Sequence, residues 1–415
     1  MRLINLFSLE FEEFFDGQIP PYAILSHRWN EREVTYKDFL KAKVIDGSSY
    51  DKILGFCAFA RERKARVWDK QACRMQETAI EWGWVDTYCI DKKSSAELSE
   101  AINSMFGWYH NAAVCYVYLA DVEGTAGSAA FNDSVWWRRG WTLQELLAPW
   151  DVVFCNDMWE VIGHKCTHGN GGRPLPTPCE ISYGPSLNSS ITALTRINDI
   201  YLSGPLYIFD ASIACRMSWA ASRNTTRVED LAYCLLGIFE VNMPLLYGGG
   251  GKAFLRLQET ILRNSNDQSI FAWYSRLAGR GLFASHPVAF AQSSHIILPQ
   301  IDPLASHSLT SNGLEMRVKA QDAYNHYTKS PNANVRLVKL NCGVYEATEY
   351  PGERKFKPAE IALSKVRSEN PTQYRRVYCG LIPEDVEEMF PEDIRQDVGD
   401  VLLHIKAWDP VHDFA

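Results

Sequence analysis

One segment of this chain, Ala112–Leu119 (AAVCYVYL), is apolar or aromatic at every position. A strand that is apolar on both faces must be covered on both faces, which is typical of the centre of a parallel sheet. Parallel strands in turn need a long crossover, usually a helix, between them. Three other short apolar segments are expected to be strands of the same sheet: Tyr22–Leu25, Gly83–Asp86 and Val152–Cys155.

Helical patterns lie between these predicted strands. Ser94 and Glu97 form a capping box that opens the clearest helix. Its apolar face consists of Leu98, Ala101, Ile102, Met105 and Tyr109. A second apolar stripe precedes the strand at Gly83 and consists of Ala72, Met75, Ala79 and Trp82. The alternation predicts an α/β fold over residues 1–173, with an open parallel sheet covered by helices.

The remaining sequence predicts two further regions. Residues 174–267 begin with a loop rich in Pro, Gly and Ser up to Ser186 and continue as a helical extension. Residues 268–415 are expected to form a separate β-rich domain. The predicted β-like runs in that domain are Ser269–Phe271, Ile296–Leu298, Leu314–Val318, Val335–Leu340, Arg376–Cys379 and Val401–Lys406.

Composition excludes several classes of protein. The chain has 415 residues and a net charge of −8, which argues against a general binder of nucleic acid or of anionic membranes. The N-terminus lacks the pattern of a secretory signal, and no apolar run is long enough to span a membrane. The 11 cysteines are odd in number and mostly single, which favours free buried thiols and a cytoplasmic protein.

A single carboxylate stands out in the segment Trp136–Pro149 (WWRRGWTLQELLAP). Aromatic and guanidinium side chains surround Glu145 in the sequence, and Pro149 ends the helix that begins there. An acid in such a setting can serve chemistry on a sugar or a base. The alternative is a buried helix in which Glu145 forms an ion pair with Arg138 or Arg139.

Polar residues also follow the predicted strands. The first strand leads into Ser26, His27, Arg28 and Trp29, and the second leads into Asp86. Because open parallel sheets bind ligands at the carboxyl ends of their strands, we expect Ser26, Arg28, Asp86 and Glu145 to approach one site. Each residue also has a structural alternative. Ser26 and Asp86 would cap helices, Arg28 would form a surface ion pair, and His27 would be a loop histidine.

Two other patterns do not predict sites. Gly248–Lys252 lacks the spacing of a phosphate-binding loop, and a turn that opens a helix is the preferred interpretation. His164, Cys166, His168 and Cys179 match no standard zinc spacing. We therefore expect no metal and no permanently bound cofactor.

Four segments together resemble the fungal heterokaryon-incompatibility (HET) domain. The resemblance runs in order from residue 1 to about residue 265, and its motifs are highly specific. It implies a role in fungal non-self recognition and programmed cell death, with protein partners or self-assembly. The segments are Tyr22–Trp29 (YAILSHRW), Trp84–Lys92 with Glu97–Tyr109, Trp136–Pro149, and Arg227–Glu259.

The HET domain in turn is similar to TIR domains, a second resemblance that implies an open sheet of TIR/flavodoxin-like type. Trp141–Leu146 (WTLQEL) is similar to the TIR motif Trp-Cys-x-x-Glu-Leu, whose glutamate is the catalytic acid of NAD-cleaving TIR enzymes. By this match Glu145 is the catalytic residue and NAD is the substrate of an NAD glycohydrolase. The nucleotide site would consist of Ser26, His27, Arg28, Trp29, Asp86 and Trp141.

This chain departs from the TIR pattern in two places. Thr142 replaces the usual cysteine, and residues 52–70 form an insertion that can alter or cover the site. In an enzyme, Trp29, Trp137 and Trp141 would stack on a base or exclude water, and Arg28, Arg138 or Arg139 would meet a pyrophosphate. Two alternatives stay open: a non-catalytic death-signalling and assembly module, and a metabolic enzyme on a HET-like fold.

Overall fold

The computed structural model forms two compact units. The first contains Met1–Asp210, Arg223–Thr226 and Tyr233–Leu245, and the second contains Ala211–Ser222, Arg227–Ala232 and Leu246–Ala415. The boundaries expected after residues 173 and 267 remain predictions. The structure describes residues 1–15, 17–29, 33–40, 48–69, 73–124, 128–167, 183–274, 281–299, 307–310, 313–325, 330–347, 354–365, 373–377 and 396–405.

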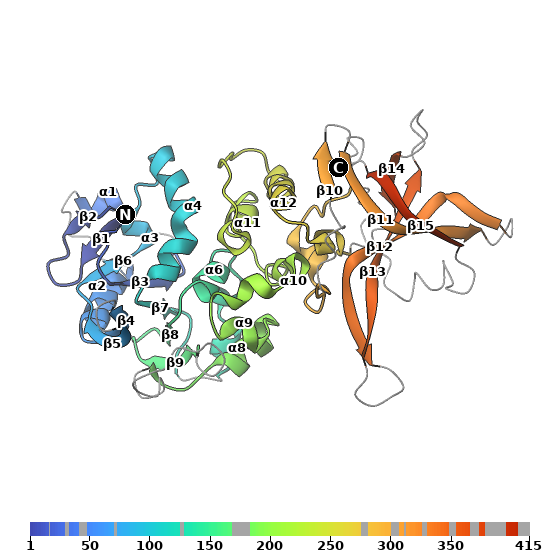
Figure 1. The fold of residues 1–415 in the computed structure, drawn as a ribbon. Coiled ribbons are helices and arrows are strands. Elements are labelled where there is room, and N and C mark those ends of the chain that lie inside the picture. The colour runs from blue at the N-terminus through green and yellow to red at the C-terminus, as the bar shows by residue number, and fades with distance from the viewer. Residues whose placement is uncertain are drawn as a thin grey trace. The chain divides into compact units, whose positions relative to one another are not determined.

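The first unit is built on a seven-stranded sheet with the order β2-β1-β6-β3-β7-β8-β9 (Figure 1). Strand β3 runs parallel to both β6 and β7, and β7 runs parallel to β8. This confirms the α/β fold and the four predicted strands. The strand bounds are β1 Arg2–Asn5, β2 Phe11–Glu13, β3 Tyr22–His27, β6 Trp82–Trp84, β7 Val114–Tyr118, β8 Val152–Cys155 and β9 Val161–Lys165.

The sheet is mixed and not wholly parallel. The N-terminal hairpin β1–β2 adds to β6 in antiparallel fashion, and β9 adds antiparallel to β8. The four parallel strands lie in the chain order 2-1-3-4, which begins the 2-1-3-4-5 order of flavodoxin-like sheets. The chain order reverses between β3 and β7. In open α/β sheets a ligand crevice forms at such a reversal, outside the carboxyl ends of the strands.

The predicted helix after Ser94 is confirmed as α4, Ser95–Asn111. The Ser94 hydroxyl accepts a hydrogen bond from the Glu97 N–H at 3.3 Å, which is one half of the predicted capping box. The other half differs, because the Glu97 carboxylate accepts from the Asp91 N–H at 2.7 Å and pairs with Arg2 at 2.9 Å. The buried face consists of Ala101, Ile102, Met105 and Tyr109.

The helix predicted from Ala72, Met75, Ala79 and Trp82 is wrong. Residues of this stripe lie instead in β5, Arg74–Ala79, which pairs antiparallel with β4, Lys64–Asp69, and in β6. Ala72 lies outside the described residues. Helices α1, Tyr36–Leu40, and α2, Ser48–Arg61, precede this hairpin. The spacing of the stripe suits a helix, but antiparallel pairing with the neighbouring strand β4 overrides this periodicity.

A buried ion pair anchors the hairpin to the sheet. Arg66 of β4 donates from both Nε and Nη2 to the carboxylate of Asp151, with the Nε–Oδ2 distance at 3.2 Å. Both side chains are 5% exposed. Asp151 directly precedes β8, whereas Ser26 is the penultimate residue of the parallel strand β3. This part of the insertion therefore contacts the sheet at the amino end of β8, whereas Ser26 lies at the carboxyl end of β3.

Helices dominate between residues 188 and 271. This confirms the helical extension, but the predicted strand Ser269–Phe271 is wrong, because Asp267 caps a 3₁₀ turn there by accepting from the Ser269 N–H at 2.8 Å. The elements are α8 Asn188–Thr195, α9 Asp199–Leu202, η2 Tyr207–Asp210, α10 Ile213–Ser218, α11 Asp230–Tyr233, η3 Gly237–Phe239, α12 Lys252–Asn264 and η4 Gln268–Phe271, followed by η5 Pro287–Phe290.

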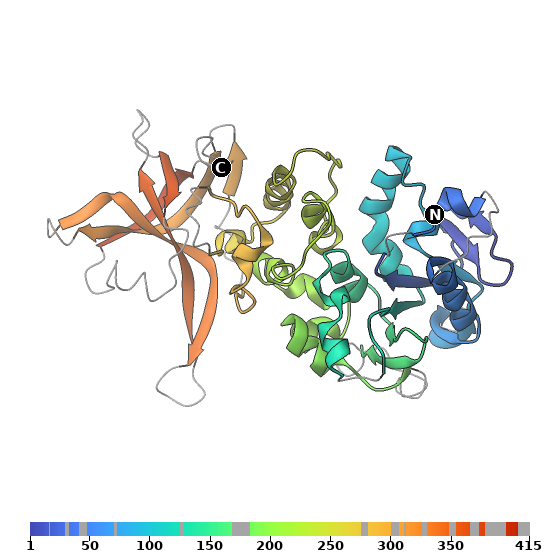
Figure 2. The same cartoon turned by 180° about the vertical axis from the view of Figure 1, so that it is seen from behind.

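The second unit contains the β-rich region that the sequence predicted, with long strands visible in Figure 2. Strand β11 pairs with both β12 and β15, so the ladder from β11 through β15 closes on itself. Closure removes exposed strand edges. The strands are β10 His307–Thr310, β11 Gly313–Asn325, β12 Ser330–Ala347, β13 Arg354–Lys365, β14 Gln373–Val377 and β15 Gln396–Ile405.

Two expectations about the whole chain concern thiols and membranes. Cys89, Cys115, Cys155 and Cys234 are free and buried, as predicted. Burial raises the pKa of the Cys89 thiol to about 12, so this thiol stays protonated. Among the helices that the structure describes, none has the length and apolar character that crossing a membrane requires.

The buried ion pair gives a stability prediction. We expect Asp151→Ala to lower the free energy of unfolding by ~3–5 kcal/mol, because Arg66 would keep a buried charge without its partner. Urea unfolding followed by tryptophan fluorescence measures this change. The matched control, Arg66→Met combined with Asp151→Leu, should lose less than Asp151→Ala alone. A double variant as unstable as the single one would contradict this account.

Candidate functional site

Glu145 lies in α6, Thr142–Leu147, the short helix between β7 and β8. The residue is only 8% exposed. The Ser26 hydroxyl donates a hydrogen bond to its Oε2 atom. A carboxyl group is thus held, almost out of solvent, beside the carboxyl end of β3 and the reversal point of the sheet.

Ser26 is fixed by a second hydrogen bond. The Trp136 indole Nε1–H donates to the Ser26 Oγ at 2.8 Å. Because the indole group can only donate, the serine accepts from it and its own proton is directed at Glu145. Ser26 lies within a strand and caps no helix, so the structural alternative for this residue is wrong.

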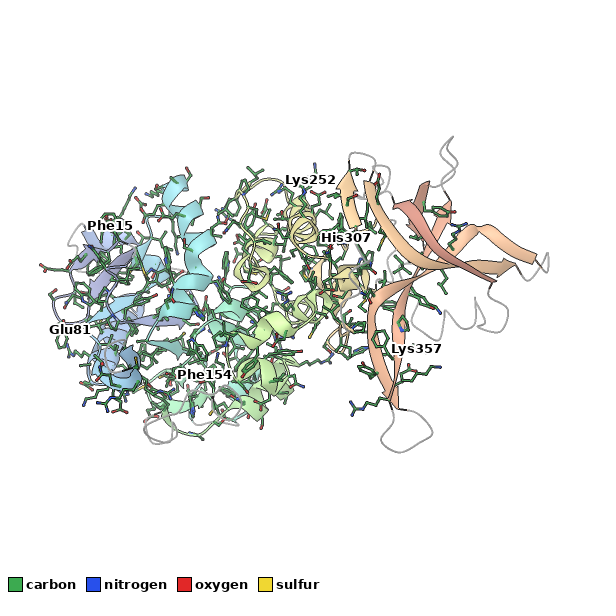
Figure 3. All side chains as sticks on the ribbon, viewed as in Figure 1. Phe15, Glu81, Phe154, Lys252, His307 and Lys357 are labelled. Atoms are coloured by element: carbon green, nitrogen blue, oxygen red, sulfur yellow. The ribbon has the colours of Figure 1, made fainter. Side chains whose placement is uncertain are left out.

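Trp136 is held in place by an aromatic cluster. Its ring contacts those of Trp137 and Phe154 at centroid distances of 4.8 and 5.6 Å. Phe154, labelled in Figure 3, is fully buried in β8. Trp137 donates its indole N–H to the Phe131 carbonyl at 2.7 Å and is 6% exposed, so it is a core residue and not a wall for a ligand.

The turn before α6 is braced by a segment distant in sequence. Gly140 donates its N–H to the Asn224 carbonyl at 2.8 Å, and Asn224 donates its N–H to the Arg138 carbonyl at 2.7 Å. A Cβ atom at Gly140 would lie 2.5 Å from Thr225 Cγ2. Only glycine therefore permits this close approach.

Arg223 completes the brace. Its Nη1 donates to the Thr142 hydroxyl and to the Arg139 carbonyl, each at 2.9 Å. Thr142, which stands where the TIR motif has cysteine, thus has a structural partner here. Sequence reasoning missed Arg223, because nothing in its local sequence signals a contact 81 residues away.

A second polar cluster centres on Asp86, the first residue of α3, Asp86–Cys89. Asp86 makes no side-chain cap to this helix, so the capping alternative is wrong. Its Oδ1 lies 3.2 Å from His27 Nε2, and its Oδ2 accepts from the Trp29 indole N–H at 2.9 Å and from Lys92 Nζ at 3.4 Å. Lys92 was not predicted as a site residue.

The start of the insertion reaches this cluster. Lys52 of α2 pairs with Glu33 at 2.5 Å and donates to the Arg28 carbonyl at 3.4 Å. Glu33 Oε1 also lies 3.9 Å from His27 Nδ1. Burial lowers the pKa of His27, so the imidazole is neutral at physiological pH.

The structure thus connects most of the predicted site residues in two groups. Ser26 joins Glu145, and Asp86 joins His27 and Trp29. The Arg28 side chain is exposed and Trp141 is half-buried, and among the described residues neither side chain forms a hydrogen bond or an ion pair.

The two carboxylates have opposite electrostatics. Burial raises the pKa of Glu145 to about 7, although the hydrogen bond from Ser26 and the charges of Arg139 and Arg223 oppose the rise. Burial also favours protonated Asp86, but the Lys92 charge and the His27 hydrogen bond prevail and hold its pKa well below the usual range. Environments that raise the pKa of one acid and lower the pKa of its neighbour are typical of sites in which one group acts as an acid and the other as a base.

The ion-pair interpretation of Glu145 finds no support. Among the described residues, no salt bridge joins Glu145 to Arg138 or Arg139. Arg138 is exposed and Arg139 is half-buried. The charge of Arg139 lowers the pKa of Glu145 without forming a salt bridge to it.

The Gly248–Lys252 segment forms the turn that the sequence predicted at the start of a helix. The N–H groups of Gly248 and Gly250 donate to the Glu229 carboxylate at 2.7 and 3.0 Å, and Lys252, labelled in Figure 3, begins α12. No cluster of metal-binding side chains occurs among the residues that the structure describes. His168 and Cys179 lie outside those residues.

Comparisons with known proteins support the predicted family. The family model "Heterokaryon incompatibility protein (HET)" matches residues 22–133, and a domain of unknown function (DUF8212) matches residues 252–312. The chain is 43% identical over 257 residues to the Vegetative incompatibility protein HET-E-1 of Podospora anserina. The match covers 59% of this chain and 16% of that relative, so the chain spans about a sixth of its length. No solved structure matches the chain.

The burial of Glu145 predicts an unusual stability profile. Its pKa rises on folding from 4.5 to about 7, so ionisation destabilises the fold by roughly 3 kcal/mol at pH 8. Between pH 4.5 and about pH 7, Glu145 is protonated in the folded state and ionised in the unfolded state. The free energy of unfolding therefore falls as the pH rises through this range. We expect Glu145→Gln to be more stable than the natural protein at pH 8 by up to this amount, and equally stable near pH 4.

Denaturant unfolding at a series of pH values measures the difference. The exposed acid Glu100 provides the matched control, since Glu100→Gln should change stability little at any pH. A Glu145→Gln protein that is less stable at pH 8 would instead indicate a structural ion pair.

Proposed function

The chain carries a HET domain, and from this premise we propose that it is an effector of heterokaryon incompatibility. In this role it contributes to fungal non-self recognition and to the cell death that follows. The name of its relative, a vegetative incompatibility protein, supports the proposal. The proposed partners are proteins, which include further copies of this chain.

We propose further that the Glu145 site cleaves NAD in the manner of TIR enzymes. The single observation that carries this proposal is the placement of Glu145. Its carboxyl group is buried, has a pKa of about 7, and is oriented by Ser26 beside the reversal point of the sheet. A protein has no structural need to bury an acid there without an ion pair, and strongly perturbed acids cluster at functional sites.

The proposed reaction breaks the bond between ribose C1′ and the nicotinamide nitrogen. The bonding electron pair leaves with nicotinamide, which departs as a neutral base, and the ribose becomes an oxocarbenium-like cation. Ionised Glu145 stabilises this cation, as carboxylates do in glycoside hydrolysis. Water then adds to C1′ and releases one proton, so the products are nicotinamide, ADP-ribose and H⁺.

Other side chains have supporting roles in this proposal. Ser26 orients the carboxylate, and the exposed ring of Trp29 offers a face for a base. Asp86 fixes the edge of Trp29 and the ring of His27. Arg28 lies between His27 and Trp29 in the sequence, and Trp141 directly precedes α6; both complete the proposed nucleotide site.

One observation favours the alternative of a non-catalytic assembly module. The N-terminal hairpin places the short strand β2 at the edge of the sheet. Phe7, in the turn that follows β1, and Phe15, just after β2, are 61% and 75% exposed. Exposed aromatic side chains beside an open strand edge suit a protein contact. This surface is compatible with catalysis, because assembly and cleavage can occur in one protein.

The NAD prediction concerns Glu145 directly. We expect Glu145→Gln to lower NAD turnover by about 100-fold or more, because one preorganised electrostatic group contributes about that much to a rate. Release of ADP-ribose is measured on the full chain at high concentration, which favours assembly. Glu100→Gln should retain full turnover. Equal turnover in natural and Glu145→Gln proteins would refute the catalytic assignment.

The pKa of Glu145 also predicts the pH profile. Since the ionised form is the active one, kcat/KM should rise about tenfold per pH unit below about 7 and level off above it. Ser26→Ala removes a hydrogen bond that lowers this pKa, so the midpoint should move to higher pH. A profile whose midpoint stays fixed or moves to lower pH in Ser26→Ala would exclude Glu145 as the titrating group.

A further inference from the structure

The segment Arg223–Thr226, which we call the clamp segment, belongs to the first unit, but the chain on either side of it belongs to the second. Ala211–Ser222 precedes it and Arg227–Ala232 follows it. The chain therefore enters the first unit for four residues and leaves it again. A segment this short has little conformational freedom of its own when both ends are fixed, so its position depends on the two flanking segments.

The clamp segment holds the turn that carries Glu145. Arg223 is 2% exposed, and its Nη1 donates to the hydroxyl of Thr142, the first residue of α6, and to the Arg139 carbonyl. The backbone of Asn224 forms two further hydrogen bonds with this turn. Glu145 follows Thr142 by three residues in the same short helix. A movement of the clamp segment therefore changes the support of the acid.

The chain before the clamp segment is fixed through α10, and we call this attachment the first anchor. The Ile213 N–H donates to the Asp267 carboxylate at 2.7 Å. The Ala214 N–H donates to the Ser269 hydroxyl at 3.0 Å. Backbone hydrogen bonds of the helical type continue from α10 as far as Ala221. Only one residue then separates this fixed backbone from the clamp segment.

The first anchor is joined in turn to the β-rich region. Gln268 of η4 accepts a hydrogen bond at Oε1 from the Asn341 N–H of β12 at 2.8 Å. The Ser212 hydroxyl, at the start of α10, donates at 2.6 Å to the carbonyl of the residue before Ile297. Ile297 and Gly343 of β12 exchange two backbone hydrogen bonds at 2.9 and 3.1 Å. A continuous series of bonds thus leads from β12 to α10.

The chain after the clamp segment is fixed to the glycine-rich turn that opens α12, and we call this attachment the second anchor. Glu229 Oε1 accepts from the N–H groups of Gly248 at 2.7 Å and Gly250 at 3.0 Å. Both glycines have positive φ angles, of 89° and 54°, which glycine adopts without strain. Asp230 accepts from the Tyr247 hydroxyl at 3.0 Å. The glycine-rich turn therefore holds the clamp segment from its other end.

We propose that the clamp segment transmits changes in the second unit to Glu145. While both anchors hold, Arg223 keeps the turn before α6 rigid and the acid oriented. A partner protein that displaces either anchor relaxes this turn. Such coupling requires a contiguous physical network, which the two anchors and the clamp segment provide. The inference rests on the proposed function only where it assigns a task to the Glu145 site, because it concerns the support of the acid and not the reaction.

Hydrogen–deuterium exchange of the full chain, followed by mass spectrometry, tests this proposal without any need for turnover. Peptides that span residues 136–149 report on the clamp segment, because the Gly140 N–H is bound to it. Glu229→Ala removes two hydrogen bonds of the second anchor, and we expect it to speed exchange in these peptides by about 5- to 30-fold. Glu229→Gln keeps an oxygen acceptor and should retain most of the protection.

The second unit offers a matched control and a second test variant. Gln258 of α12 also forms two hydrogen bonds to backbone groups, with the carbonyl and the N–H of Ala284 at 2.7 and 3.0 Å, and these bonds belong to neither anchor. Gln258→Ala should therefore leave exchange in residues 136–149 unchanged. Ser269→Ala removes one bond of the first anchor and should speed the same exchange by a smaller factor than Glu229→Ala.

An insertion separates coupling through the chain from a general loss of stability. Thr226 and Arg227 are both exposed, so two glycines inserted between them lengthen the connection and leave the contacts of the clamp segment in place. In this background Glu229→Ala should no longer alter exchange in residues 136–149.

Three results would overturn the inference. They are no effect of Glu229→Ala in the natural chain, an equal effect of Gln258→Ala, and an effect of Glu229→Ala that persists after the insertion. Absence of NAD turnover in all variants would instead refute the proposed reaction and leave the coupling as measured.

Discussion

The hydrogen bond between Ser26 and Glu145 joins two parts of the chain that are 119 residues apart. It connects the end of β3 to α6, and so fixes an acid beside the point where the strand order reverses. The bond depends on Trp136, whose indole N–H determines the direction of the serine proton. The aromatic cluster around Trp136 and Phe154 then ties this arrangement to the core of the sheet. Trp136 and its packing partner Trp137 thus have a structural role, which is to orient one carboxyl group.

Burial of that carboxyl group opposes stability, and the surrounding structure must hold it in place. Gly140 and Thr142 allow the turn before α6 to pack against the segment at Arg223, which forms four hydrogen bonds with that turn. The brace restricts the position of the helix while it leaves the carboxylate without an ion pair to Arg138 or Arg139. A buried acid that destabilises the fold but is held rigidly is expected where a protein gives up stability for activity.

The neighbouring acid behaves in the opposite way. Asp86 is kept ionised by Lys92 and His27, and it organises Trp29 at the surface. The two clusters share the electrostatic influence of Arg139. One half of the region therefore holds an acid that stays ionised, and the other half holds an acid that changes its protonation near neutral pH. Their proximity follows from the parallel sheet, which brings the ends of β3 and β6 to the same edge.

The sequence by itself determined the parallel strands, helix α4 and the positions of Ser26 and Asp86 at the carboxyl ends of β3 and β6, because apolar periodicity, capping residues and sheet topology are local or general signals. It also carried the HET resemblance, which depends on ordered motifs. Tertiary structure alone decided the rest. Hairpin β4–β5 forms where a helical stripe was predicted, since Arg66 pairs with a residue 85 positions away. The roles of Arg223 and Lys92 likewise depend on contacts in space, because a single charged residue in a sequence does not reveal which distant group will balance its charge.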